Sequence, residues 1–247
     1  MKKITFCLFI LISFISCNAP PNGASNGISR LVNLSDDDLG NNQVLFSQMW
    51  VWEYHIEQES EDKIRIKKDG KIELYYNPQK KYWLFTKSGA LGILGEMTNW
   101  IIGRPDGSYI TSVMPEFPGE DTLIDIEQVE SVLPNSLPAN FKPTGDKKTF
   151  NDNNWGFEKI IGDEYLAEEA NAYPKHTLYF APYQVDFSPI YNFSKRKSEI
   201  QLAYEFPENI PANMLLLEET RDIRSGQYTF NFIGISNTEY YIDMPVQ

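Results

Sequence analysis

Large apolar side chains alternate with polar ones along much of this chain, and a period of two is the pattern of a β-strand with one buried face. The first such run covers residues 49–57, where apolar side chains occupy every second position from Trp50 to Ile56. Comparable runs predict further strands at 63–67, 72–76, 82–85, 100–102, 109–113, 177–180, 200–206, 214–217, 228–233 and 240–242. The pattern therefore predicts a chain that is mostly β.

Short segments rich in Asp, Asn, Pro and Gly separate several of these runs. Asp69–Gly70 predicts a hairpin turn, because glycine accepts a positive φ without a steric penalty. Asn77–Pro78 predicts a second turn, and Arg104–Gly107 predicts a third, in which proline presets φ. Strands joined by such turns lie antiparallel, so the sequence predicts an antiparallel meander.

Other segments break the period of two. Apolar positions between 121 and 133 recur at a spacing near 3.6, which predicts a helix capped by Asp121. Short helices are expected at 39–46 and 163–172, and residues 134–154 are expected to form a long loop. The predicted fold class is therefore α+β, mostly antiparallel β: a curved meander or half-barrel sheet with one or two helices packed on it.

The first sixteen residues predict a signal peptide. Met1–Lys3 is a short basic head, and residues 4–15 form an almost unbroken apolar run. A membrane-spanning helix needs roughly 20 apolar residues, so this shorter run fits the core of a signal peptide. Residues 17–27 are rich in Pro, Gly, Asn and Ser, and they predict a flexible tether ahead of a single β-rich globular domain at 28–247.

The apolar run ends at Phe14–Cys17, a segment that resembles the lipobox of bacterial lipoproteins. In that family the signal is cut just before the cysteine, whose thiol receives a diacylglycerol. The resemblance implies lipidation at Cys17 and a lasting anchor, because each buried CH₂ contributes about 0.8 kcal/mol. Asn18 differs from the Asp-type retention signal of enteric lipoproteins, which favours the outer membrane, facing the periplasm. An ordinary secretory signal followed by an unmodified Cys17 is the alternative.

The charge and the cysteine content of the chain exclude some classes of partner and some kinds of chemistry. The chain carries 22 Lys+Arg against 34 Asp+Glu, for a net charge of −12. Cleavage before Cys17 would remove two lysines and no acid, which makes the body more acidic still. Duplex nucleic acid needs a basic surface, so nucleic acid is excluded as the main partner. Cys7 would leave with the signal and Cys17 would carry lipid, so no thiol would remain for a disulfide, catalysis or metal binding.

A group of features near the C-terminus is found together in one known family. They are Pro211, the strand at 214–217, Gly226, the aromatic strand at 228–232 and the closing Asp243–Pro245. By pattern, this third of the chain resembles the LolA-like periplasmic carriers of lipids and lipoproteins. Those proteins are half-open antiparallel barrels around a helical plug, so the resemblance implies a fold of that kind.

Catalytic motifs are scarce. His55 is interpreted as an exposed strand histidine rather than a base or metal ligand, and His176 has no carboxylate spaced to orient it. Two histidines cannot build a His-Glu-x-x-His zinc site, and the Gly-x-Ser-x-Gly elbow of many hydrolases is absent. We therefore expect no metal, no cofactor and no enzymatic activity.

Acidic and glycine-rich segments have ordinary structural interpretations. The acids of 57–61 are expected to pair with the bases of 63–67, and Glu168–Glu169 and Glu218–Glu219 are expected to be salt-bridged or solvated. Two of these carboxylates could still converge in a cleft, as in a glycosidase. Gly89–Gly95 lacks the Lys-Ser/Thr ending of a phosphate loop and is predicted to be an apolar turn packed on the sheet.

The aromatic residues are the remaining functional signal. The candidate ligand-binding residues are the five tryptophans Trp50, Trp52, Trp83, Trp100 and Trp155. A large aromatic face either fills a core, which is the favoured interpretation, or lines a cavity for a ligand. Trp155 differs because it stands in the polar segment Asp152–Gly156, where it is the candidate for an exposed ring that contacts a glycan or partner.

Together these features predict a non-enzymatic lipoprotein of the cell envelope. The membrane is its first predicted partner, through a lipid on Cys17, and an apolar small molecule or an envelope protein is the second. A carbohydrate-binding lipoprotein that uses exposed aromatic rings is the alternative. A carboxylate-dependent hydrolase is a third and weaker hypothesis.

Overall fold

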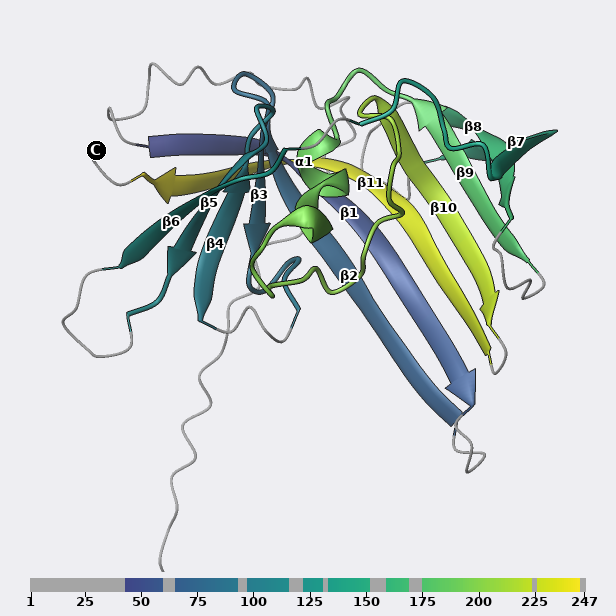
Figure 1. Ribbon diagram of the computed structural model, residues 1–247, viewed down its shortest axis with the longest axis horizontal. Helices are drawn as coiled ribbons and strands as arrows, with labels where there is room; N and C mark the ends of the chain where they lie inside the picture. The colour runs from purple at the N-terminus through teal and green to yellow at the C-terminus, as the bar shows by residue number, and fades with distance from the viewer. Residues whose placement is uncertain are drawn as a thin grey trace, which may run out of the picture. The chain divides into compact units, whose positions relative to one another are not determined.

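Antiparallel strands form one open 11-stranded sheet in the part of the chain that the structure, a computed structural model, describes (Figure 1). The described residues are 43–59, 65–92, 97–115, 122–130, 133–151, 159–168, 175–223 and 226–244. The strands are β1 (Gln43–Glu59), β2 (Arg65–Asn77), β3 (Tyr82–Thr86), β4 (Thr98–Gly103), β5 (Ser108–Val113), β6 (Leu123–Gln128), β7 (Phe141–Phe150), β8 (Ile160–Ala167), β9 (His176–Pro182), β10 (Met214–Ile223) and β11 (Gly226–Asp243).

The strand order is β6-β5-β4-β3-β2-β1-β11-β10-β9-β8-β7. Strands that follow one another in sequence are therefore neighbours in the sheet, except for β6 and β7, which form its two free edges (Figure 1). The long strands β1 and β11 pair at the centre, from Gln43 opposite Asp243 to Gln58 opposite Gly226. The predicted antiparallel meander is confirmed, and a curved sheet is consistent with it.

The helical part of the predicted fold class is overstated. Within the described ranges, the helices are α1 (Ser188–Tyr191) and the short 3₁₀ turn η3 (Phe193–Lys195). The helix predicted at 121–133 is wrong, because this stretch holds edge strand β6. Ile124 and Ile126 do alternate there with Asp125 and Glu127, but the additional apolar Leu123 obscured the period of two.

The other expected helices and the long loop also fall within strands. Residues 163–167 continue β8, and Asp163, expected to start a helix, instead forms an ion pair with Lys147 of β7 at 2.7 Å. The loop expected at 134–154 contains β7, which is solvent-exposed on both faces and therefore carries no alternating pattern. Of the helix expected at 39–46, residues 43–46 belong to β1 and the rest lie outside the described residues.

Two further expectations about turns and strands are wrong for a local reason. Asp69–Gly70 is not a turn, because β2 continues through it; a Cβ at Gly70 would overlap the ring of Tyr54, which lies across this glycine. Residues 200–206 do not join the sheet: Leu202 forms an isolated bridge with Leu91, which lies outside the strands, and the chain bends at 203–204. Their alternating side chains pack on the sheet without pairing to it, which produces the same sequence pattern as a strand.

The turn at Arg104–Gly107 is confirmed. It joins β4 to β5, and Gly107 has a φ of +85°, which a glycine adopts without strain. Strands β10 and β11 form a hairpin, with Ile223 opposite Gly226 and Glu218 opposite Asn231. The beginning of β10, from Met214 to Leu216, pairs with β9 instead.

The sheet is apolar on both faces near its centre. We call the face covered by residues 183–211 the inner face and the opposite one the outer face; residues 183–211, which include α1 and η3, are called the strap (Figure 1). The inner face carries the main core. On the outer face, the first residues of β1 and the last of β11 pack on β3–β5, with a buried cluster of Val44, Phe46, Leu84, Ile102, Ile110 and Ile242. Irregular pairing between Phe46 and Gln48 accompanies this second layer.

Candidate functional site

Aromatic rings fill the inner face of the sheet. Trp50 and Trp52 are each 1% exposed and Trp83 is fully buried, and all three belong to the main core. The Trp50 ring centroid lies 5.5 Å from that of Trp83, and Trp52 stacks on Phe230 at 6.3 Å with an interplanar angle of 2°. The rings therefore pack mainly on one another, as the core-filling interpretation expected.

The indole N–H groups fix the orientation of these rings. Trp52 Nε1 donates to the carbonyl of Leu216 at 3.0 Å, and Trp83 Nε1 donates to the carbonyl of Asp186 at 2.8 Å. Asp186 belongs to the strap, so the second bond ties the strap to β3. A buried indole that has a hydrogen-bond partner gives the site a defined geometry as well as apolar area.

The remaining predicted site residues lie elsewhere. Trp100 is half-buried on the outer face, where it packs against the second apolar cluster. Trp155 and Cys17 lie outside the described residues. The structure thus brings three of the five candidate tryptophans together on the inner face.

The strap covers this aromatic surface mainly with side chains. Its own rings include Phe187, which is 5.5 Å from Trp50, and Phe206, which is 5.3 Å from Trp52. Its main chain is hydrogen-bonded to residues 90–92 and 212–213. The strap is thus a covering segment laid on the sheet rather than a twelfth strand.

The Tyr109 hydroxyl provides another tether for the strap. It donates to the carbonyl of Pro189 in α1 at 2.7 Å. Burial raises the pKa of this phenol, so Tyr109 remains a neutral donor at physiological pH. The ring also packs edge-on against Phe193 at 5.9 Å. Tyr109 therefore holds both short helical turns of the strap.

A buried ion pair secures the middle of the strap. Arg196 Nε lies 3.6 Å from Glu127 Oε2 of edge strand β6, and the two side chains are 1% and 13% exposed. Glu127 also accepts a hydrogen bond from the main-chain N–H of Lys197. The Arg196 guanidinium lies over the Phe193 ring at 4.6 Å, and burial lowers the pKa of Arg196. We call this contact the strap latch.

The far end of the strap rests beside a second polar group that the sequence did not reveal. His176 Nε2 lies 2.8 Å from Glu219 Oε1, and the two side chains are 11% and 6% exposed. The residues are far apart in the chain and meet because β9 pairs with β10. Sequence spacing therefore carried no signal of this pair, and the expectation that His176 lacks a carboxylate partner is wrong.

The strap itself encloses a space of about 10 Å³ between Ile190, Phe193, Leu202 and Phe206, which is room for one water at most. A larger hollow of about 530 Å³ lies at the β4–β5 turn, where Arg104, Asp106 and Glu130 line it beside α1. Because strap rings pack directly on Trp50 and Trp52, a ligand on the aromatic face would need the strap to move.

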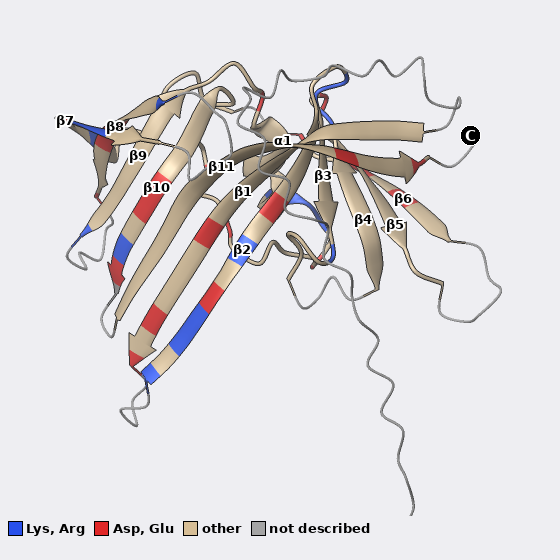
Figure 2. Cartoon of the chain, turned by 180° about the vertical axis from the view of Figure 1, so that it is seen from behind, with Lys and Arg blue, Asp and Glu red and all other residues tan. Residues whose placement is uncertain are grey.

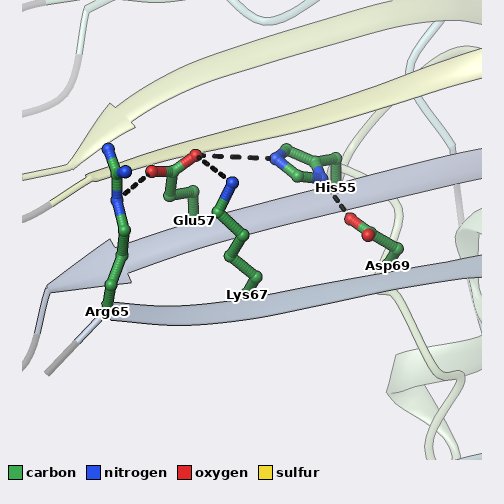
Figure 3. A network of polar contacts seen from close by, with 5 residues as sticks. All are labelled: His55, Glu57, Arg65, Lys67 and Asp69. Atoms are coloured by element: carbon green, nitrogen blue, oxygen red, sulfur yellow. Dashed lines mark hydrogen bonds and ion pairs between the residues drawn. The ribbon is translucent and has the colours of Figure 1, made fainter.

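The outer face of β1 and β2 carries a strip of paired charges (Figures 2 and 3). Glu57 contacts Arg65 and, at 3.6 Å, the Lys67 amine, while His55 contacts Asp69 and lies 3.8 Å from Glu57. Glu57 faces bases of β2 as the sequence predicted, while Glu61 and Lys63 lie outside the described residues. The His55 side chain is 45% exposed, which agrees with the strand-histidine interpretation.

We expect this charged strip to add little stability. Glu57→Gln should change the free energy of unfolding by less than about 1 kcal/mol, because its partners are solvent-exposed and their attraction is screened by salt. Urea unfolding at low and high salt measures the effect. A loss well above 1 kcal/mol that survives high salt would show that the strip is a structural centre.

Metal and membrane-spanning features are not found in the described part of the chain. No group of three or more His, Cys, Asp or Glu side chains within the described ranges is placed to hold a metal ion. Within the same ranges, no helix has the length and apolar character needed to cross a membrane.

Comparison with known proteins adds no family to this description. The chain matches no protein-family model, and no curated protein matches it.

Proposed function

We propose that this protein is a non-enzymatic lipoprotein of the cell envelope whose sheet binds an apolar ligand on its inner face, in place of the strap. The observation that supports this best is the composition of the contact between strap and sheet. Aromatic rings from both sides meet there, so removing the strap would expose a continuous apolar surface on one face of an open sheet. Surfaces of that kind on soluble domains mark binding sites.

The anchor is the second part of the proposal. Lipidation at Cys17, followed by the tether at 17–27, would hold the sheet close to a membrane and hence close to apolar ligands. Cys17→Ser should abolish metabolic labelling by a fatty-acid analogue and release the protein from membranes. Labelling that persists in this variant would overturn the anchor without affecting the binding site.

Loosening the strap should make the inner face more accessible. The Tyr204 ring of the strap stacks on Phe230 at a centroid distance of 4.1 Å and an interplanar angle of 4°. In Tyr204→Ala this stack is lost, so we expect faster and greater uptake of an apolar fluorescent probe, on the full chain carrying Cys17→Ser. Stopped-flow fluorescence measures the rate.

The outer face offers a matched control for this experiment. Tyr240 packs on Tyr75 at 4.6 Å on the opposite side of the sheet, so Tyr240→Ala removes an aromatic contact without touching the strap. This control should leave probe uptake unchanged. Equal uptake by both variants would contradict a binding site beneath the strap.

A protein partner at the edge of the sheet is a second candidate function, and strand β6 favours it. Leu123 and Ile126 of this strand are 66% and 55% exposed, and β6 contains no Pro or Lys. Edge β7, in contrast, carries Pro143 and several lysines, which block strand addition. A partner strand that pairs with β6 should bind Ile126→Lys more weakly than wild type, as measured by cross-linking in the envelope.

A further inference from the structure

Glu219 is a buried carboxylate with one oxygen unsatisfied. The residue is 5% exposed, and its Oε1 atom lies 2.8 Å from His176 Nε2. Its Oε2 atom has no hydrogen-bond partner among the described residues. Buried carboxylate oxygens are rarely left without a donor, because an unmade hydrogen bond to a charged group is costly.

The carboxylate lies on the inner face, at the end of the aromatic surface. In the sheet, Glu219 stands between Leu178 of β9 and Phe230 of β11, both fully buried in the main core. Tyr204 of the strap stacks on the same Phe230, and burial together with the nearby Glu219 carboxylate raises the pKa of Tyr204. Glu219 is therefore covered by the strap in the same way as the aromatic rings.

The adjacent residue shows that this placement is specific. Glu218 points to the opposite face, where its side chain forms an ion pair with Lys148. Glu219 has the same chemistry but is buried: its Oε1 atom pairs with His176, the Tyr204 hydroxyl of the strap hydrogen-bonds to the carboxylate, and the Oε2 atom has no partner among the described residues. The contrast separates an ordinary surface ion pair from a carboxylate with an unused acceptor in an apolar setting.

From this arrangement we infer that Glu219 recognises the polar head of the apolar ligand, and that this head is a hydrogen-bond donor of the alkylammonium class. The inference rests on the proposed function. The apolar tail would lie on Phe230 and Trp52, where the strap now packs, and the ammonium group would donate to Glu219 Oε2. An ammonium group is a compact cation with several donors, which suits a carboxylate oxygen that lacks one. The acidic chain, at −12, would also attract a cation rather than an anion.

Three probes with the same tail and different heads test the inference. Dodecylamine, dodecanol and dodecanoate compete for binding with an apolar fluorescent probe on the full chain carrying Cys17→Ser. We expect dodecylamine to bind about tenfold more tightly than dodecanol, because a hydrogen bond to a charged group is stronger than a neutral one. Dodecanoate should bind most weakly.

Two variants locate the selectivity. Glu219→Gln should reduce the preference for the amine to near unity while dodecanol binding is kept, and the matched control Glu218→Gln should keep the full preference. His176→Gln leaves the Glu219 carboxylate in place and should also keep the preference. Loss of the preference in Glu218→Gln but not in Glu219→Gln would overturn the assignment.

Wild-type binding alone separates the two proposals, even where a variant fails to fold. If none of the three probes binds, the proposed function itself fails. If all three bind equally, the apolar site stands and the recognition of an ammonium head by Glu219 is refuted. Thermal unfolding of each variant identifies those whose binding result can be compared.

Discussion

Trp52→Ala should lower the free energy of unfolding by about 3–5 kcal/mol, the usual cost of removing a large aromatic side chain from a core. The ring is 1% exposed, stacks on Phe230 and meets Phe206 of the strap edge-on. Alanine would also leave the carbonyl of Leu216 without the indole donor that lies 3.0 Å away. The substitution therefore combines a cavity with a lost hydrogen bond.

Urea unfolding followed by circular dichroism measures this loss. Trp100→Ala is the matched control, because Trp100 is only half-buried and lies on the outer face. Its cost should be clearly smaller than that of Trp52→Ala. Equal costs for the two substitutions, or a loss below about 1 kcal/mol for Trp52→Ala, would contradict the view that the inner face holds the main core.

Glu127→Gln should also be damaging, by about 3–5 kcal/mol, because it removes from the buried Arg196 guanidinium the carboxylate that acts on it most strongly. The Arg196 side chain is 1% exposed, and its Nε and Nη1 atoms already lack hydrogen-bond partners among the described residues. Removing the Glu127 carboxylate takes away most of the charge compensation of Arg196, since Asp125 acts on it less strongly. Removing the acidic residue of the strap latch should therefore destabilise the protein strongly.

Replacing the basic partner, Arg196, should reduce the free energy of unfolding much less than Glu127→Gln does. Arg196→Met keeps a long apolar stem over Phe193 and removes the buried charge, and replacing buried ion pairs with apolar residues is often neutral. Adding Arg196→Met to Glu127→Gln should therefore recover most of the lost stability, as a double-mutant cycle in urea would show. Additive losses in the double variant would refute the latch.

The central strands could be predicted because their pattern is local. From Trp50 to Ile56 every second side chain faces the core, and this period is written in the sequence. The turn at Arg104–Gly107 could be predicted for the same reason, because its proline and its positive-φ glycine belong to one short segment. These elements are determined by residues that are close together in the sequence, and the structure confirms them.

The edges of the sheet could not be predicted in this way. Most side chains of β7 and several of β6 are exposed, so burial imposes little alternation on these strands. Conversely, residues 200–206 alternate because Leu202 and Phe206 are buried in the core, although the segment does not join the sheet. The alternation of apolar and polar residues in a sequence therefore indicates which side chains are buried, and it does not indicate which segments pair as strands.

The polar contacts of the candidate site depend on strand pairing and were beyond sequence reasoning. His176 meets Glu219 only because β9 lies beside β10, and Arg196 meets Glu127 only because the strap crosses to β6. The aromatic residues of the inner face can be recognised from their spacing in the chain, whereas no local pattern places the strap on them. The strap is therefore the structural feature that changes the functional hypothesis most.

Native mass spectrometry can show whether the inner face beneath the strap binds an apolar ligand. The full chain carrying Cys17→Ser is purified from cells without detergent and its mass is compared with the mass of the polypeptide alone. We predict a bound apolar molecule that is displaced by dodecylamine. A clean polypeptide mass, with no uptake of any of the three dodecyl probes, would contradict the claim.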